Sequence, residues 1–284
     1  MAGTVSPEAV SAATATAPAA APGAADALSS ASAQVAHTGL ALVFDKIEYA
    51  IVVPLVYASL AFLLVAIVLR LVAILRDPRE PFQLAIYPAP RSAFAGAMRD
   101  AFAMPQVMRR DPLFWVFLMC YHLGFIALIV GHLDILPEIN IMPAASRHML
   151  GAGLVGLMVT VPTFYFIGRR FKGEVRKIST PGDYLLLLLL LFTFLFGDLM
   201  SWGNSWTASG FVMTKADFAK YFDGLARFSF ADPRLVLHGS HYHFVVIHVL
   251  LAELFFIVLP FTKVMHAFLA LPVNALRRRV WKRN

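Results

Sequence analysis

The sequence predicts an all-α integral membrane protein whose five transmembrane helices form one bundle. Of the 284 residues, 59% are hydrophobic and 14% are charged, whereas soluble globular domains have about 45–50% apolar and about 25% charged residues. The mean hydropathy is +0.71, and apolar stretches long enough to cross a bilayer recur along the chain. These observations exclude a water-soluble enzyme with one buried core.

The chain contains a single cysteine, Cys120. A disulfide framework, a cysteine-ligated iron–sulfur cluster, a zinc ribbon and a C-x-x-C-H haem attachment all need more than one cysteine. This chain alone therefore builds none of them. The net charge of +7 is interpreted first as a topology signal, because basic residues orient membrane proteins, and it does not indicate nucleic-acid binding.

Residues 1–42 form a low-complexity tail rich in Ala, Ser, Thr, Pro and Gly, which predicts a disordered extension rather than a signal peptide. Residues 43–284 are predicted to form the helical domain. Its five apolar stretches are each close to the roughly 20 residues that a helix needs to span a bilayer. They lie at about 48–72, 113–133, 149–168, 184–203 and 243–264.

The connecting segments carry the orientation signal. Six cations lie in the loop 76–112, five in the turn after the third span and five in the C-terminal tail, whereas the opposite side holds six in all. The excess of basic residues predicts an N-terminus outside and a C-terminus in the cytoplasm.

Two connecting segments are predicted to have structure of their own. The stretch Ser92–Arg110 combines arginines with Met, Phe and Ala, which indicates a helix on the inner membrane surface. The segment 205–240 is long, mixed in charge and rich in aromatic residues, and is expected to cap the outer end of the bundle.

Four histidines lie within or near the apolar spans. The second span contains His122 and His132, and the fifth contains His248 with His266 at its end. Because the two helices run antiparallel in the predicted topology, His132 meets His248 near the outer surface and His122 meets His266 near the cytoplasm. Two stacked bis-histidine sites are what a b-type cytochrome with two haems within its bundle needs.

The helix spacings of the two pairs are unequal. Residues 122 and 132 are about 15 Å apart along an ideal helix, and residues 248 and 266 about 27 Å. The pairs are compatible if the helices are inclined, and Pro260 offers a kink in the fifth span. Glycines of the second and third spans fit either close approach of a macrocycle or helix packing; they are Gly124, Gly131, Gly151, Gly153 and Gly156.

The alternative is that single histidines only form hydrogen bonds between helices; the paired spacing favours ligation. His238, His241 and His243 have a spacing that fits a metal, but interfacial or proton-handling roles near the outer site fit better. His148, at the start of the third span, is interpreted in the same way.

At these residues the sequence resembles the cytochrome b (gamma) subunit family of respiratory nitrate reductases. The resemblance runs from the second span to about residue 280. It is carried by three motifs: His122-Leu-Gly with Gly131-His132; Gly168-Arg-Arg-Phe with Val175-Arg176, Thr180 and Asp183; and His248 with Leu-Pro-Phe-Thr-Lys up to His266. It implies two haem b groups, an inner one on His122 and His266 and an outer one on His132 and His248.

Some features resemble more closely the DsrM-type branch, found in sulfite-reductase-linked transmembrane complexes. These features are Ala252-Glu253, and the outer residues Tyr221, Gly224-Leu225 and Phe228. The nitrate reductase subunits have a lysine near an outer quinol site, where this sequence has Ser146, Arg147 and His148. Gly131 and Arg147 are therefore the candidate quinone-site residues. An equally good role for Arg147 is to pair with a haem propionate.

The resemblance implies a quinone-reactive electron-transfer subunit of a multi-subunit oxidoreductase in the inner (plasma) membrane. Its cytoplasmic partner would be an iron–sulfur subunit, similar either to the nitrate reductase beta subunit or to heterodisulfide reductase, alongside further membrane or periplasmic subunits. The basic segments Arg91–Arg110 and Arg169–Lys177 either dock this partner or serve only topology and lipid contact.

Two alternatives remain at this point. One is a haem-free transporter or assembly protein whose histidines and Glu253 relay protons. The other is a stand-alone quinone-linked reductase without soluble partners.

Overall fold

The computed structural model describes residues 39–76, 93–136, 138–139, 141, 153–206, 215–237, 241–271 and 274. The chain divides into a unit Met1–Phe44 and a unit Asp45–Asn284. The first helix begins at Gly39, within the segment 1–42 that was expected to be disordered. Residues 1–38 lie outside the described part of the chain.

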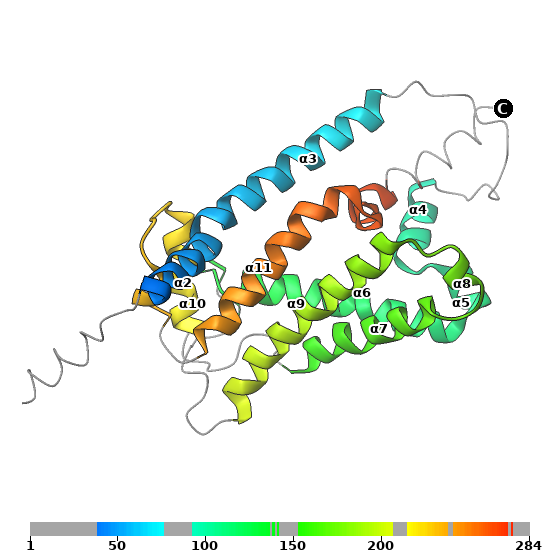
Figure 1. The fold of residues 1–284 in the computed structure, drawn as a ribbon. Coiled ribbons are helices and arrows are strands. Elements are labelled where there is room, and N and C mark those ends of the chain that lie inside the picture. The colour runs from blue at the N-terminus through cyan, green and yellow to red at the C-terminus, as the bar shows by residue number, and fades with distance from the viewer. Residues whose placement is uncertain are drawn as a thin grey trace, which may run out of the picture. The chain divides into compact units, whose positions relative to one another are not determined.

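The regular structure of the described residues is helical throughout (Figure 1). A continuous helical stretch comprises α2 (Gly39–Ala50), the π-helix η1 (Ile51–Leu55) and α3 (Val56–Arg76). The following elements are α4 (Ala93–Phe102), α5 (Pro105–Arg110), α6 (Pro112–Leu133), α7 (Leu154–Arg170), α8 (Gly173–Lys177), α9 (Pro181–Trp206), α10 (Lys215–Ala226), the 3₁₀-turn η2 (Pro233–Leu235), α11 (Tyr242–Val258) and the 3₁₀-turns η3 (Leu259–Phe261) and η4 (Lys263–Met265).

Within the described residues, four helical stretches are long and apolar enough to cross a membrane: Ala41–Ile74, Pro112–Leu133, Pro181–Trp202 and Tyr242–Phe261. They correspond to four of the five predicted spans. At the position of the remaining span, α7 has 17 residues and follows Gly153, whose φ of 88° is in the left-handed region. Residues 149–152 of that predicted span lie outside the described residues, so the five-helix count stays a prediction.

The long helices of the unit Asp45–Asn284 pack in the order α6, α7, α9, α11 and α3. Gly124 allows α6 to approach α7 closely, since a Cβ there would lie 2.8 Å from Met158 Cβ. Gly156 makes room for the Asp198 carboxylate of α9, which accepts a hydrogen bond from Thr160 Oγ1 at 2.8 Å. Helix packing is therefore the role of Gly124 and Gly156.

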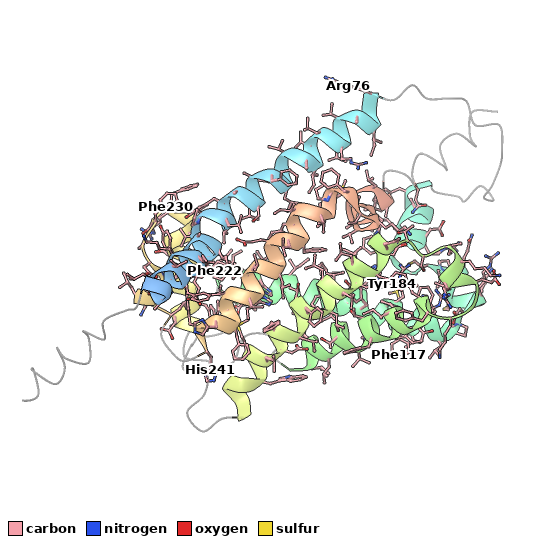
Figure 2. The ribbon with its side chains drawn as sticks, in the orientation of Figure 1. Arg76, Phe117, Tyr184, Phe222, Phe230 and His241 are labelled. Atoms are coloured by element: carbon pink, nitrogen blue, oxygen red, sulfur yellow. The ribbon has the colours of Figure 1, made fainter. Side chains whose placement is uncertain are left out.

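The helix α10 lies at one end of this unit, and α5 and α8 lie at the other (Figure 1). We call these the α10 end and the α8 end. The helix α6 runs from the α8 end to the α10 end, whereas α3 and α11 both run in the opposite direction. Phe222 and Phe230 are found at the α10 end, and Phe117 and Tyr184 toward the α8 end (Figure 2).

Residues 215–237 of the predicted cap pack against the α10 end of the bundle. Phe218 and Tyr221 of α10 join an apolar cluster with Val52 and Val53 of η1. The hydroxyl of Tyr221 donates a hydrogen bond to the Val52 carbonyl. A buried ion pair between Lys215 Nζ and Asp134 Oδ2, 2.8 Å apart, fastens α10 to the end of α6.

Two predicted helices are interrupted. The stretch Ser92–Arg110 forms α4 and α5, separated by Met104 with φ of 43°. The fifth span is α-helical only to Val258, continues as a 3₁₀-turn through Pro260, and becomes extended at Thr262 (φ −107°, ψ 172°). The interruption expected at Pro260 is thus a full break in the α-helix rather than a kink, because proline lacks the amide hydrogen that the helix ladder needs.

Candidate functional site

The structure brings the four histidines together as two pairs. The ring centroids of His122 and His266 are 6.0 Å apart, with ring planes at 72°. The ring centroids of His132 and His248 are 6.3 Å apart, with ring planes at 14°. We call these the α8-end pair and the α10-end pair.

All four imidazoles use the same ring nitrogen for a hydrogen bond within the protein. Each Nδ1 lies 2.7–2.9 Å from a backbone carbonyl oxygen; the acceptors for His122, His132, His248 and His266 are those of Leu118, Leu128, Thr193 and Lys263. A carbonyl oxygen only accepts hydrogen bonds, so each Nδ1 carries the hydrogen. The lone pair of each Nε2 is left for a metal, which is the arrangement of most metal-ligating histidines.

The separation within each pair fits one metal ion between two imidazoles. Two imidazoles bound to one metal on opposite sides have ring centroids about 6.3 Å apart, from two metal–nitrogen bonds of about 2.0 Å and about 1.15 Å between each nitrogen and its ring centre. Among the described residues, no three His, Cys, Asp or Glu side chains are grouped to hold a metal ion. Two axial imidazoles are the donor set that a six-coordinate haem takes from a protein.

The α8-end pair depends on an ionic contact that the histidine pattern did not reveal. Asp183, 5% exposed at the start of α9, binds Lys263 Nζ at 2.9 Å and Arg170 at 3.5 Å. The Lys263 carbonyl accepts the hydrogen bond from His266 Nδ1 at 2.8 Å. Asp183 thus fixes the turn that presents His266. Asp183 and Lys263 occur in the motifs of the family resemblance, which was the only sequence signal for them.

The α10-end pair is positioned by helix packing. His248 donates a hydrogen bond across to the Thr193 carbonyl of α9 at 2.9 Å. A Cβ added to Gly197, one turn further along α9, would lie 3.2 Å from His248 Cε1. Gly197 therefore allows the imidazole to approach the α9 backbone. Sequence reasoning missed Gly197, because a glycine in an apolar helix has no distinctive pattern.

The outer histidines are only partly described. His243 is exposed and contacts the Glu48 carboxylate, and the His241 ring stacks on Phe244. Arg234 binds Asp45 and Glu48; burial alone would lower its pKa, but these carboxylates raise the pKa above its usual value. Among the described residues, no metal site forms around this group.

Of the candidate quinone-site residues, Gly131 is buried in α6. Arg147 lies outside the described residues, as do His148 and His238.

The predicted docking residues have two kinds of environment. Arg169 pairs with Asp111 at 3.6 Å and stacks over the Phe114 ring at 4.2 Å, and Arg170 binds Asp183. These two arginines therefore stabilise the fold itself. Lys172 and Arg176, by contrast, are exposed at the α8 end.

Comparison with known proteins identifies the family of the chain. Residues 103–282 match the family described as nitrate reductase gamma subunit. The chain is 30% identical over 168 residues to the nitrate reductase gamma chain of Bacillus subtilis (strain 168), which covers 56% of this chain and 73% of that relative. The match includes all four paired histidines and every long helix except the first. The chain therefore belongs to the nitrate reductase gamma subunit family, the membrane subunits of an oxidoreductase complex.

Proposed function

We propose that this chain is the quinone-reactive cytochrome b subunit of a respiratory oxidoreductase in the inner membrane. In this proposal His122 and His266 hold one haem b, and His132 and His248 hold the other. The observation that carries the proposal is the geometry of the two pairs: their ring centroids lie 6.0 and 6.3 Å apart, which fits one iron between two imidazoles, and each Nδ1 is already bonded to a carbonyl. Bound haem would supply reversible one-electron redox chemistry.

The residues around each pair determine what the site does. Each haem would be held by two imidazoles, which would leave no position open for oxygen, so the site would favour electron transfer over binding of oxygen. The four Nδ1 hydrogen bonds fix the ring orientations and increase the basicity of the ligand nitrogens. The Tyr121 ring packs edge-on against the His122 ring, and Phe125 and Phe194 pack against Tyr121. Apolar surface therefore adjoins the α8-end pair and lowers the local dielectric.

The haem content of the purified chain tests this proposal. We expect two haem b groups per chain, both low-spin, in the absorption spectrum of the dithionite-reduced protein. A spectrum without b-type bands would instead favour the haem-free transporter or assembly protein.

The orientation and the partner form the second part of the proposal. The distribution of basic residues favours the α8 end in the cytoplasm, where an iron–sulfur subunit would receive or donate electrons at the α8-end pair. Exposed Lys172 and Arg176 at this end are suited to an acidic partner surface. Nitrate is the terminal substrate that the name of the Bacillus subtilis relative suggests.

Charge reversal tests the docking surface. Replacing Lys172 and Arg176 by Glu should reduce copurification of the iron–sulfur subunit and leave both haems bound. Lys220→Glu, at an exposed position of α10, is the matched control and should leave the complex intact. Equal copurification of all variants would leave only the topology and lipid roles for these cations.

We further propose that the quinol site lies at the α10 end, where Gly131 is buried near the end of α6, and that Arg147 contributes to it. Arg147 can donate a hydrogen bond to a quinol oxygen but cannot accept its proton, because a guanidinium stays charged; a nearby histidine has to accept it. Arg147→Gln should slow haem reduction by quinol and spare reduction by dithionite. Unchanged rates of haem reduction by quinol would show that the quinol site lies in another part of the chain.

A further inference from the structure

Glu253 differs from the other buried acids among the described residues in its hydrogen bonding. It lies in α11, within a membrane-spanning stretch, and is 2% exposed. Neither of its carboxyl oxygens has a hydrogen-bond partner. The other buried acids differ in this respect: Asp134 binds Lys215, Asp183 binds Lys263, and Asp198 accepts from Thr160. A buried carboxylate without a partner carries a large desolvation cost, so its charge depends on positive charge nearby.

The position of Glu253 on α11 separates it from the histidine face. It follows His248 by five residues, which places it about 140° around the helix and about 7.5 Å further along the axis. It follows Val246 by seven residues, or two turns, and Val246 packs in the cluster with Val52 of η1. Glu253 therefore faces the α3 side of α11, at a depth between the two histidine pairs.

The matching position on α3 is also polar. Ser59 follows Val52 by seven residues, is 1% exposed and donates a hydrogen bond to the Val56 carbonyl at 3.0 Å. The helices α3 and α11 run in the same direction (Figure 1), and Ser59 and Glu253 each follow a residue of the shared cluster, Val52 or Val246, by seven positions.

Several polar side chains lie where α11 begins, at the α10 end. Tyr221 of α10 and Tyr242 of α11 pack in the same cluster as Val246, and burial, more than the neighbouring charges, raises the pKa of Tyr221. The Tyr242 ring lies under Arg234, with 5.5 Å between the ring centroid and the guanidinium carbon. Arg234 binds Glu48, which contacts exposed His243. These groups begin at the surface and end at the cluster that contains Val246, two turns before Glu253 on α11.

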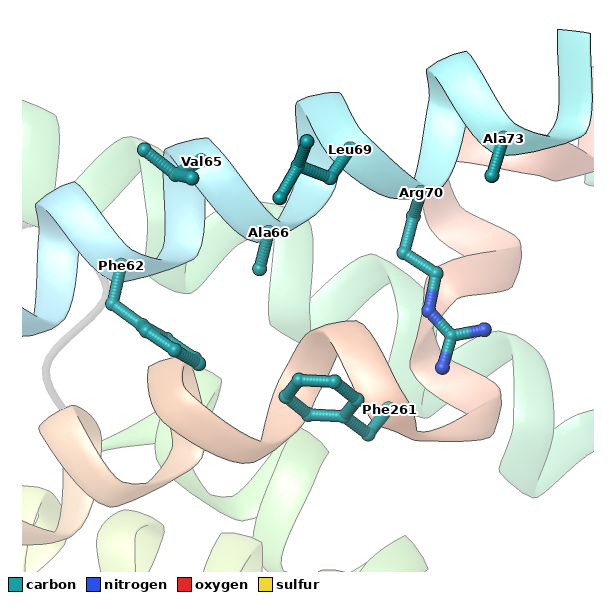
Figure 3. A pocket seen from close by; sticks show the side chains of 7 residues that line it. All are labelled: Phe62, Val65, Ala66, Leu69, Arg70, Ala73 and Phe261. Carbon is teal, nitrogen blue, oxygen red and sulfur yellow. The ribbon is translucent and has the colours of Figure 1, made fainter. Parts of the chain in front are cut away.

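The enclosure of Glu253 limits what it can bind. An apolar pocket of about 330 Å³ lies further along α3, next to Phe261 and Arg70, and Glu253 is not among its lining residues (Figure 3). The Glu253 carboxyl is closed in by its neighbours, and a proton is the ligand that fits without displacing them.

We propose that Glu253 is a redox-linked proton site. It takes up a proton when an electron enters one of the two haems and releases the proton when the electron leaves. This inference rests on the proposed function. The electron would come from quinol, and the Glu253 carboxylate would become a carboxylic acid by taking a proton from the water at the α10 end. The physical cause is that reduction removes the positive charge that favours the carboxylate.

The other ionisable groups on α11 and on the elements packed against it have partners of their own or lie on the histidine face. Tyr57 of α3 donates to the Leu225 carbonyl, and Arg70 lies over Phe261. The remaining groups are Asp198 of α9 with Thr160, Lys263 beyond η3 with Asp183, Tyr221 of α10 with the Val52 carbonyl, and, on α11 itself, Tyr242 beneath Arg234 and His248 with the Thr193 carbonyl.

Redox titration of the full chain, in its complex, tests the inference. In the wild-type protein the midpoint potential of at least one haem should fall with rising pH, with a slope approaching 59 mV per pH unit for one proton per electron. Glu253→Gln should abolish that slope with both haems still bound, because an amide cannot titrate. The matched control Asp198→Asn removes a buried acid of another membrane-spanning helix, α9, and should keep the slope.

An infrared difference spectrum, reduced minus oxidised, gives a second measurement. It should show the carbonyl band of a protonated carboxylic acid, absent in Glu253→Gln and retained in Glu253→Asp. The inference is overturned by two pH-independent potentials in the wild-type protein, or by an unchanged slope in Glu253→Gln. A protein that binds no haem would instead overturn the proposed function, so the two failures are distinguishable.

Discussion

The α8-end pair and the α10-end pair use the same side-chain chemistry, but different kinds of backbone carry them. His132 and His248 both belong to long α-helices, α6 and α11. In the α8-end pair, His122 belongs to α6, whereas His266 follows two 3₁₀-turns and an extended residue. The ring planes are nearly parallel in the α10-end pair, at 14°, and steeply inclined in the α8-end pair, at 72°.

The contacts that hold the histidines also differ between the two pairs. His248 is held by a backbone carbonyl and by the space at Gly197, which are neutral packing contacts. His266 is held by a turn that Asp183 fastens through Lys263. Packed helices position His248 without an ion pair, whereas the irregular turn before His266 is held by a specific ion pair. The two sites should therefore respond differently to mutation and to salt.

The largest expected effect separates the two sites. His266→Ala should remove the α8-end haem and His248→Ala the α10-end haem, each reducing the haem content to about one per chain, since one axial ligand is lost. Redox titration of each variant should find one remaining potential, different in the two variants. Two low-spin haems in either variant would contradict the assignment of that histidine.

Removing the charge of Asp183 should weaken the α8-end site alone. Asp183→Asn weakens the contacts with Thr180, Lys263 and Arg170 together, a loss of about 1.5–3 kcal/mol. This corresponds to about 10- to 150-fold weaker haem binding if the turn no longer holds His266. Haem content after mild detergent washing measures this effect. Glu174→Gln breaks the exposed Lys177 pair and serves as a control without effect. Loss of both haems from Asp183→Asn would show that the whole bundle depends on this ion pair.

Filling the space beside His248 should weaken the α10-end site alone. Gly197→Val pushes against the imidazole, and overpacking of this kind costs about 1–3 kcal/mol. Gly168→Val in α7 is the control, because no heavy atom lies within 4 Å of a Cβ there. Spectra should show partial loss or altered ligation of the α10-end haem only. Unperturbed spectra would mean that α9 shifts easily and does not position His248.

Ionic strength should have the smallest effect, and only at the α8 end. The Lys263 side chain is 70% exposed, and exposed ion pairs contribute about 0.2–1 kcal/mol and are screened by salt. Raising the salt concentration should therefore weaken the α8-end haem up to about fivefold. In a Lys263→Met variant this salt dependence should vanish. Equal salt sensitivity of both haems would remove the distinction between the two anchors.

The histidine spacing predicted which rings lie together, but not how the backbone achieves it. Spacings of 10 and 18 residues do not match on straight helices, and Pro260 only indicated a kink; the structure has a break that extends to Thr262. The ion pair between Asp183 and Lys263 joins residues 80 positions apart, so no local pattern reveals it.

Helix existence was easier to predict than helix interruption. The four long apolar stretches follow from composition alone. The π-helix at Ile51–Leu55 and the break at Met104 depend on packing around single residues. The absence of a partner for the Glu253 carboxyl is likewise a property of its three-dimensional surroundings, which the sequence only marked as an acid in an apolar span.

The ion pair between Asp134 and Lys215 also constrains how the protein assembles. Asp134 is 1% exposed and follows His132 by two residues, whereas its partner is synthesised 81 residues later. Until α9 has been inserted and α10 has folded back, Asp134 has to remain in contact with water, because burying its charge without Lys215 is costly. The α10 end of a nascent chain therefore stays open beside His132, and it closes only when most of the bundle is complete. The site that is built from rigid helices therefore stays in contact with water until the chain beyond α9 has folded back.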